Sequence, residues 1–224
     1  MTAREPKTTE SERGGFLYDP DEAVRHLSSV DSTLGSFIER AGPFNMRLRS
    51  MHNPFEALAR NIIYQQLHGT AAAAIHRRVL ALFGRDKLRP RDVFNASDES
   101  LRGAGLSGAK LAALKDLAAK TMDGTVPTLA RLQRMGDEEI VERLTQVRGV
   151  GRWTVEMLLI FRLGRPDVLP VGDFAVRKGF SLAYGLSEMP KPKELMQYGE
   201  RWRPFRSVAS WYMWRASELL PKSI

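Results

Sequence analysis

One short stretch of this sequence combines residue types that could bind an anion. Two glycines stand between two arginines directly before an apolar helical pattern, in the order Arg148-Gly149-Val150-Gly151-Arg152-Trp153-Thr154. Glycine permits positive φ and lets a ligand approach the backbone closely. The amides of residues 149–154 would lie at a helix N-terminus, where several donors lack intrahelical partners, and the arginines would add positive charge. The stretch is therefore either a phosphate-binding turn or a plain connection between two helices.

A second candidate is a single carboxylate, Asp173, which follows Gly172 at the apparent start of a helix. In the N-cap position its side chain would accept a backbone hydrogen bond, which contributes about 1 kcal/mol to stability. The helix N-terminus would favour the ionised carboxylate, whereas burial in a closed pocket would favour the protonated one. From these residues alone, Asp173 is compatible with a structural cap and with a catalytic group.

The composition points to an anionic partner and excludes several kinds of site. The formal net charge is +8 and the pI is about 10.0, which makes nucleic acid the leading candidate. There is no cysteine, which excludes disulfides, iron–sulfur clusters and thiol nucleophiles. None of the four histidines has another at i+4, so the sequence gives no metal site. The apolar run from Met157 to Phe161 is too short to span a bilayer.

Helices are the elements that must position these residues. An apolar stripe from Phe55 to Ile63 has helical spacing, and Asn53-Pro54 supplies a cap and a first-turn proline before it. Further helices are predicted over residues 69–84, 107–122, 153–163, 173–183, 193–202 and 208–220, with short ones beginning near 97, 127 and 137. Alternation of apolar and polar residues is absent, which predicts few or no strands. Many short helices joined by short turns indicate an all-α fold.

Four motifs, in this order, resemble those of one family. They are IIYQQLHGTAAAAIHRRV over residues 62–79, the V-x-G-V-G turn with its flanking helices over 139–161, Asp173 after a Gly/Pro-rich connection, and ERWRPFRSVASWYMW over 200–214. Together they resemble the helix-hairpin-helix superfamily of base-excision DNA glycosylases, and in particular the AlkA-type 3-methyladenine DNA glycosylases II. The similarity covers roughly residues 44–220. The mixed α/β N-terminal domain of the longer AlkA-type enzymes has no counterpart in it.

The resemblance implies a two-lobed helical glycosylase fold with the helix-hairpin-helix motif at the rim of a cleft between the lobes. We expect one lobe over residues 55–166. The other would combine a helical N-terminal part (16–54) with a C-terminal part (167–224), and residues 1–15 would form a disordered tail.

The reaction follows from one substitution within the family pattern. Trp153 stands where family members that also cut the strand carry a lysine nucleophile, and an indole cannot replace a lysine. The resemblance therefore implies hydrolysis alone, without a cofactor. The substrates would be alkylated purines, chiefly 3-methyladenine and 7-methylguanine, and the product an abasic site. Asp173 would be the catalytic group, because a carboxylate stabilises the oxocarbenium character that develops on the sugar.

The resemblance also assigns binding residues. Trp153, Trp214, Tyr212 and Met157 would line the base pocket, where electron-rich rings stack on a positively charged purine. Met157 departs from the tyrosine that AlkA-type enzymes can carry there. Leu67 would be the wedge that fills the gap left by a flipped base, with Gln66 beside it on the DNA; its alternative is an ordinary leucine at a helix end. The remaining DNA contacts would come from the hairpin, at Arg148, Gly149, Val150, Gly151, Arg152 and Thr154, and its carbonyls are the place for a monovalent cation.

The expected partner is double-stranded DNA that contains damaged bases. We expect a monomer without membrane association, in the cytoplasm of a bacterium and associated with its nucleoid. Two other functions remain open. The first is a bifunctional glycosylase/lyase for oxidised bases, which Trp153 opposes. The second is a non-enzymatic DNA damage-binding module, in which Asp173 would be dispensable.

Overall fold

The structure is a computed structural model and describes residues 15–220. Its elements are α1 (Pro20–Val30), α2 (Ser32–Ala41), α3 (Pro54–Tyr64), α4 (Gly69–Leu82), α5 (Pro90–Asn95), α6 (Asp98–Gly103), α7 (Gly108–Met122), α8 (Leu129–Leu132), α9 (Asp137–Leu144), α10 (Arg152–Phe161), α11 (Phe174–Ala183), α12 (Pro192–Gly199), the 3-10 turn η1 (Glu200–Trp202) and α13 (Arg206–Leu219). No strand occurs between residues 15 and 220, so the predicted all-α class is confirmed. The predicted tail lies, except for Gly15, outside the described residues.

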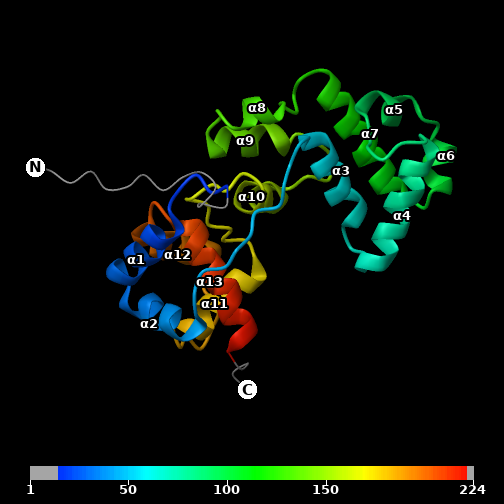
Figure 1. Ribbon diagram of the computed structural model, residues 1–224. Helices are drawn as coiled ribbons and strands as arrows, with labels where there is room; N and C mark the ends of the chain where they lie inside the picture. Colours follow the sequence, from blue (N-terminus) through cyan, green and yellow to red (C-terminus); the bar gives the residue numbers. More distant parts are fainter. Residues whose placement is uncertain (1–14, 221–224) are drawn as a thin grey trace, which may run out of the picture. The chain divides into compact units, whose positions relative to one another are not determined.

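The helices form two compact units. One unit holds the described residues up to Arg49 and from Glu156 onward, and the other holds Ser50–Val155. Figure 1 shows α1, α2, α11, α12 and α13 gathered in the first unit and α3 to α9 in the second. The division falls inside α10, upstream of the boundary predicted at residue 166. Within the first unit, the Arg49 amide donates to the carbonyl of Phe161, the last residue of α10, at 2.8 Å.

The closest helix pair of the first unit is α11 with α13. Gly179 of α11 faces the backbone of α13, and a Cβ atom at this position would lie 1.7 Å from the Met213 carbonyl oxygen. Only a residue without a side chain permits so short a distance between two helices. This approach sets the distance between the middle of α11 and the middle of α13.

The connection that leads from α10 to α11 is fixed to the start of α13. Arg206, which is buried, pairs with Asp167 at 2.6 Å. The Ser207 amide donates to the Pro166 carbonyl at 2.9 Å, and its hydroxyl accepts a bond from the Val168 amide at 3.0 Å. These bonds hold residues 166–168 against α13, a few residues before Asp173.

A buried carboxylate, Asp31, organises the aromatic core of the first unit. Its Oδ2 accepts hydrogen bonds from the Tyr184 hydroxyl at 2.7 Å and from the Trp202 indole at 2.9 Å, and its Oδ1 caps α2 by accepting from the Leu34 amide at 3.1 Å. Trp202 is completely buried, as expected of a core residue. Burial acts to raise the pKa of Asp31, but these hydrogen bonds lower it overall.

We expect this carboxylate to make the protein sensitive to acid. Because the pKa of Asp31 is lower in the folded state, its contribution to stability is present above the ordinary pKa of 3.8 and is lost as the pH falls below that value. Urea unfolding at a series of pH values measures the loss. Asp31→Asn, which cannot ionise, should be less stable at neutral pH and should show a shallower acid dependence. An identical pH slope for the two proteins would contradict this role.

The second unit is built around α3 and α7. Its completely buried side chains include Phe55, Leu58, Ile62, Leu114 and Leu117. The predicted cap of α3 is confirmed, since the Asn53 side chain accepts from the Phe55 amide at 2.9 Å. The helices α3 and α7 contact each other directly, and the two segments with candidate functional residues, 65–68 and 147–154, adjoin them in this unit.

Candidate functional site

Asp173 is the N-cap of α11, as its position after Gly172 predicts. The residue is only 9% exposed. Its Oδ1 accepts two hydrogen bonds, from the Val176 amide at 2.9 Å and from the Trp214 indole Nε1 at 3.1 Å. Two donors on one oxygen fix the plane of the carboxylate, and both donors stabilise its negative charge. The cap and the candidate catalytic group are therefore one and the same side chain.

Trp214 has a contact that the sequence did not predict. Its ring is half-buried and lies 5.3 Å from the Phe161 ring, centroid to centroid, while its N–H points to Asp173. The indole therefore orients the carboxylate in addition to offering an aromatic surface. A hydrogen bond across 41 residues has no signal in the sequence, because it depends on how α11 and α13 cross.

The other predicted pocket residues differ in their surroundings. Tyr212 lies in the core of the first unit, is completely buried, and donates its hydroxyl to the Gly42 carbonyl at 3.2 Å. Trp153 is 52% exposed in the first turn of α10, and Met157, one turn later, is partly exposed. Phe174 was not among the predicted pocket residues, although it directly follows Asp173 and is 63% exposed.

The predicted phosphate-binding turn separates α9 from α10 in the second unit. Only the first of its two glycines uses the left-handed region, since Gly149 has φ +78°. A Cβ at Gly151 would meet no atom of the chain within 4 Å, so this glycine leaves the backbone open. Within residues 15–220 the amides of Gly149 and Gly151 have no acceptor. The Val150 amide between them donates to the Val147 carbonyl at 3.0 Å. Unbonded amides just before a helix are suited to bind a phosphate oxygen.

The two arginines of the turn are held in different ways. Arg152 forms a two-pronged pair with Glu138 of α9, at 3.0 and 2.7 Å, on the protein surface. Arg148 is exposed and is held by its backbone, since its amide donates to Asp116 at 2.7 Å. Burial acts to raise the pKa of Asp116, but the Arg148 amide and the Lys120 ammonium lower it overall. Val150 and Thr154 are buried and pack the turn.

Leu67 lies in the turn between α3 and α4. Its side chain is 39% exposed, and the neighbouring Gln66 has φ +56°, the one positive φ recorded for a non-glycine between residues 15 and 220. A non-glycine residue with a left-handed backbone is strained, so contacts with the surrounding structure must stabilise the turn. The structure thus presents an apolar side chain on a turn of defined shape.

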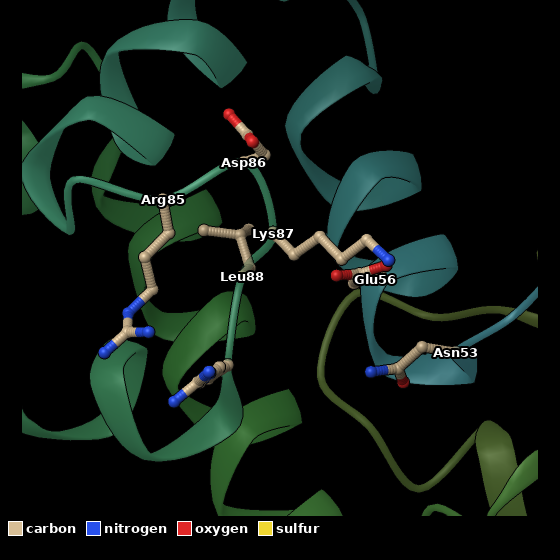
Figure 2. Close-up of a pocket in the computed structure, with 7 residues that line it drawn as sticks. Asn53, Glu56, Arg85, Asp86, Lys87 and Leu88 are labelled. Carbon is tan, nitrogen blue, oxygen red and sulfur yellow. The ribbon is translucent and has the colours of Figure 1, made fainter.

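A surface hollow of about 500 Å³ opens in the same unit, lined by Asn53, Glu56 and residues 85–89. Figure 2 shows that its lining is mostly charged, with the Lys87 side chain extending toward Glu56. None of its seven lining residues is aromatic, so it does not suit a purine. It opens at the N-terminal end of α3, about 15 Å along the helix from the Leu67 turn.

Two further findings concern membranes and metals. Among the described residues, no helix is both long enough and apolar enough to cross a bilayer. No group of three or more His, Cys, Asp or Glu side chains comes together between residues 15 and 220 in a way that could hold a metal ion.

Comparison with known proteins identifies the family. Residues 59–204 match the family described as "HhH-GPD superfamily base excision DNA repair protein". The DNA-3-methyladenine glycosylase 1 of Schizosaccharomyces pombe is 38% identical over 201 residues, which cover 88% of this chain and 88% of that protein.

Two solved structures are similar in both sequence and fold. The 3-methyladenine DNA glycosylase of Schizosaccharomyces pombe in complex with abasic DNA has a TM-score of 0.76 at 36% identity, over 88% of this chain and 97% of that one. A DNA-3-methyladenine glycosidase from Bacillus halodurans has a TM-score of 0.80 at 36% identity, over 88% and 89%. The resemblance inferred from the four motifs is thereby confirmed. The chain belongs to the HhH-GPD superfamily of base excision DNA repair proteins.

Proposed function

We propose that this protein is a monofunctional DNA glycosylase that removes alkylated purines, chiefly 3-methyladenine and 7-methylguanine, from double-stranded DNA. The observation that carries the proposal is the buried Asp173 carboxylate, oriented by the Trp214 indole and by the N-terminus of α11. It lies in a chain whose relatives are named 3-methyladenine DNA glycosylases. The product would be a free base and an abasic site.

Asp173 would act on the sugar of the damaged nucleotide. Alkylation at N3 or N7 places positive charge on the purine, so the bond between C1′ and the base nitrogen breaks readily and positive charge passes to the sugar. The carboxylate stabilises this charge and accepts a proton from the water whose oxygen bonds to C1′. Because two donors fix Oδ1, the carboxylate does not need to reorganise during the reaction.

The aromatic side chains would recognise the base. An alkylated purine is cationic and electron-poor, and an indole face attracts it. Trp214, next to Asp173, is our first candidate for this stacking, and Trp153 and Met157 are further candidates on α10. Since Tyr212 is completely buried, we propose that it supports the pocket from behind instead of touching the base.

The second unit would hold the DNA. The amides of Gly149 and Gly151 would bind a phosphate, and Arg148 and Arg152 would add charge. Leu67 would enter the base stack after the damaged nucleotide is flipped out, with Gln66 beside it. A cation at the hairpin would take carbonyl oxygens such as those of Val147 and Gly149, and would neutralise phosphate charge. Each of these carbonyls already accepts one hydrogen bond and retains a second lone pair.

Cleavage of a labelled duplex tests the proposal against the bifunctional rival. A duplex with one 7-methylguanine is incubated with the full chain and analysed before and after alkali. We expect an intact strand before alkali, a cut strand after it, and no covalent adduct in borohydride, because Trp153 cannot form a Schiff base. Strand cleavage without alkali, together with a trapped adduct, would support the glycosylase/lyase instead.

We also propose that the protein acts as a monomer in the bacterial cytoplasm, in association with the nucleoid. A solved relative from Bacillus halodurans supports the bacterial setting, whereas another relative comes from Schizosaccharomyces pombe.

Gly151→Ala should weaken DNA binding without harming the fold. The new methyl group meets nothing within 4 Å in the protein, so the free energy of unfolding should change by less than about 1 kcal/mol. It would obstruct an approaching phosphate, and we expect the affinity for an abasic-site duplex to fall about tenfold. Fluorescence anisotropy and urea unfolding measure the two effects.

The matched control is Gly136→Ala. Gly136 also directly precedes a helix, α9, and a Cβ there also meets nothing within 4 Å. Its replacement should leave the affinity unchanged. Equal affinities for the Gly151 and Gly136 variants would contradict the assignment of the phosphate to this turn.

A further inference from the structure

The turn that carries Leu67 is joined directly to the hairpin turn. Gln65, which ends α3, donates from its side-chain Nε2 to the Gly149 carbonyl at 2.9 Å, across 84 residues of sequence. Both residues belong to the second unit. The bond therefore connects the residue two positions before Leu67 with the glycine whose amide is proposed to bind phosphate.

Helix α7 forms hydrogen bonds with both segments, the end of α3 and the hairpin turn. The Lys110 ammonium donates to the Ile63 carbonyl at 2.7 Å, near the end of α3. One to two turns later, Asp116 accepts the Arg148 amide at 2.7 Å, next to Gly149. Hydrogen bonds that involve a charged group are stronger than neutral ones. α7 thus fixes the end of α3 and the start of the hairpin turn, and the Gln65 side chain links these two segments directly.

Close packing leaves the hairpin little freedom to shift along α7. A Cβ at Gly149 would lie 3.3 Å from the Ala113 side chain, and Gly149 itself has φ +78°. The Leu67 turn is constrained too, since Gln66 holds φ +56° immediately after Gln65. Because both turns have a defined backbone conformation, the Gln65 bond fixes a single distance between the Leu67 turn and the hairpin turn.

We propose that Gln65 is a positioning residue that sets the distance between the phosphate-binding turn and the Leu67 wedge. This inference rests on the proposed function and deepens it. Successive bases on one DNA strand are about 3.4 Å apart, so a wedge displaced by half that distance no longer faces the gap between two bases. With the phosphate held by Gly149 and Gly151, the Gln65 bond places Leu67 at one base step.

Gln65→Met tests the proposal, because methionine has similar length and no charge but cannot donate to Gly149. We expect single-turnover release of 7-methylguanine from a fully paired duplex to slow about tenfold. Release from a duplex in which the damaged base is unpaired in a bulge should slow much less, because that base needs little help to leave the stack. A merely structural loss would slow both substrates equally and lower the midpoint of urea unfolding.

Gln146→Met is the matched control. Gln146 also donates a side-chain amide to a backbone carbonyl, that of Glu142 at 3.3 Å, but this bond spans only four residues at the end of α9. Its replacement should leave the ratio of the two rates unchanged. Equal slowing of paired and bulged substrates by Gln65→Met, or no slowing of either, would overturn the positioning role.

A fluorescence measurement separates this proposal from the chemistry. The base 2-aminopurine, placed beside an abasic site in a duplex, brightens when its stacking is broken. The wild-type chain at saturation should produce this increase, and Gln65→Met should produce a clearly smaller one. If the wild type increases the fluorescence but releases no base, the proposed reaction is refuted while the positioning role of Gln65 still stands. If the wild type does not increase the fluorescence, the role of Gln65 is overturned.

Discussion

Asp173→Asn is expected to slow single-turnover base release by about a thousandfold while the protein still binds abasic-site DNA. The variant removes the negative charge that stabilises the sugar in the transition state and keeps the size of the side chain. Affinity for the product should change little, because the proposed phosphate contacts come from the hairpin of the second unit.

The structure predicts that this variant folds normally. The asparagine carbonyl oxygen can still accept the hydrogen bonds from the Val176 amide and the Trp214 indole, and asparagine is as good an N-cap as aspartate. Asp19→Asn is the matched control, because Asp19 is the N-cap of α1 in the same unit and accepts from the Asp21 amide at 2.9 Å. Its rate should equal that of the wild type. Unchanged turnover by Asp173→Asn would contradict the mechanism, and binding without release by the wild type would favour the damage-binding module.

Gly179→Ala is expected to have the largest effect on stability. The added Cβ would lie 1.7 Å from the Met213 carbonyl oxygen and 2.6 Å from the carbonyl carbon, and backbone atoms cannot rotate away as a side chain can. α11 and α13 would have to separate, so we expect the free energy of unfolding to fall by about 3 kcal/mol or more. Urea unfolding measures this loss.

The same change should also impair the site. Separation of α11 from α13 lengthens the bond between Asp173 and Trp214, which lie on these two helices. Gly103→Ala is the control, since Gly103 is also helical and a Cβ there meets nothing within 4 Å. It should be neutral or slightly stabilising. A Gly179 variant as stable as the Gly103 variant would contradict the close packing of these helices.

Local signals in the sequence predicted much of the fold. Asn53, Ser107 and Asp173 were recognisable as helix starts, and each caps its helix through a hydrogen bond to a nearby amide. Such bonds span two or three residues, so the sequence order alone contains the information they require.

Contacts between distant residues could not be predicted in this way. The bonds from Gln65 to Gly149, from Trp214 to Asp173 and from Trp202 to Asp31 join residues 84, 41 and 171 positions apart. Each depends on how helices pack, which the spacing of apolar residues does not determine. The same holds for the turn glycines, which look equivalent in the sequence although only Gly149 has a positive φ.

Tyr212 shows that the role of a side chain could not be predicted from its position in the motif alone. An aromatic residue two positions before Trp214 fits a base-stacking motif, yet its ring is completely buried and its hydroxyl binds the Gly42 carbonyl. The positions are neighbours in sequence, but on a helix they point about 200° apart. Family resemblance assigned both to one pocket, whereas the helix directs one ring to the core and the other toward Asp173.

Identification of the released base tests the central claim most directly. The full chain is incubated with methylated double-stranded DNA, and the free bases in solution are separated by chromatography and identified. We predict free 3-methyladenine and 7-methylguanine with the wild type, and neither above background with Asp173→Asn. Methylated DNA that yields no more free base with the wild type than with Asp173→Asn would contradict the claim that this protein is an alkylpurine DNA glycosylase.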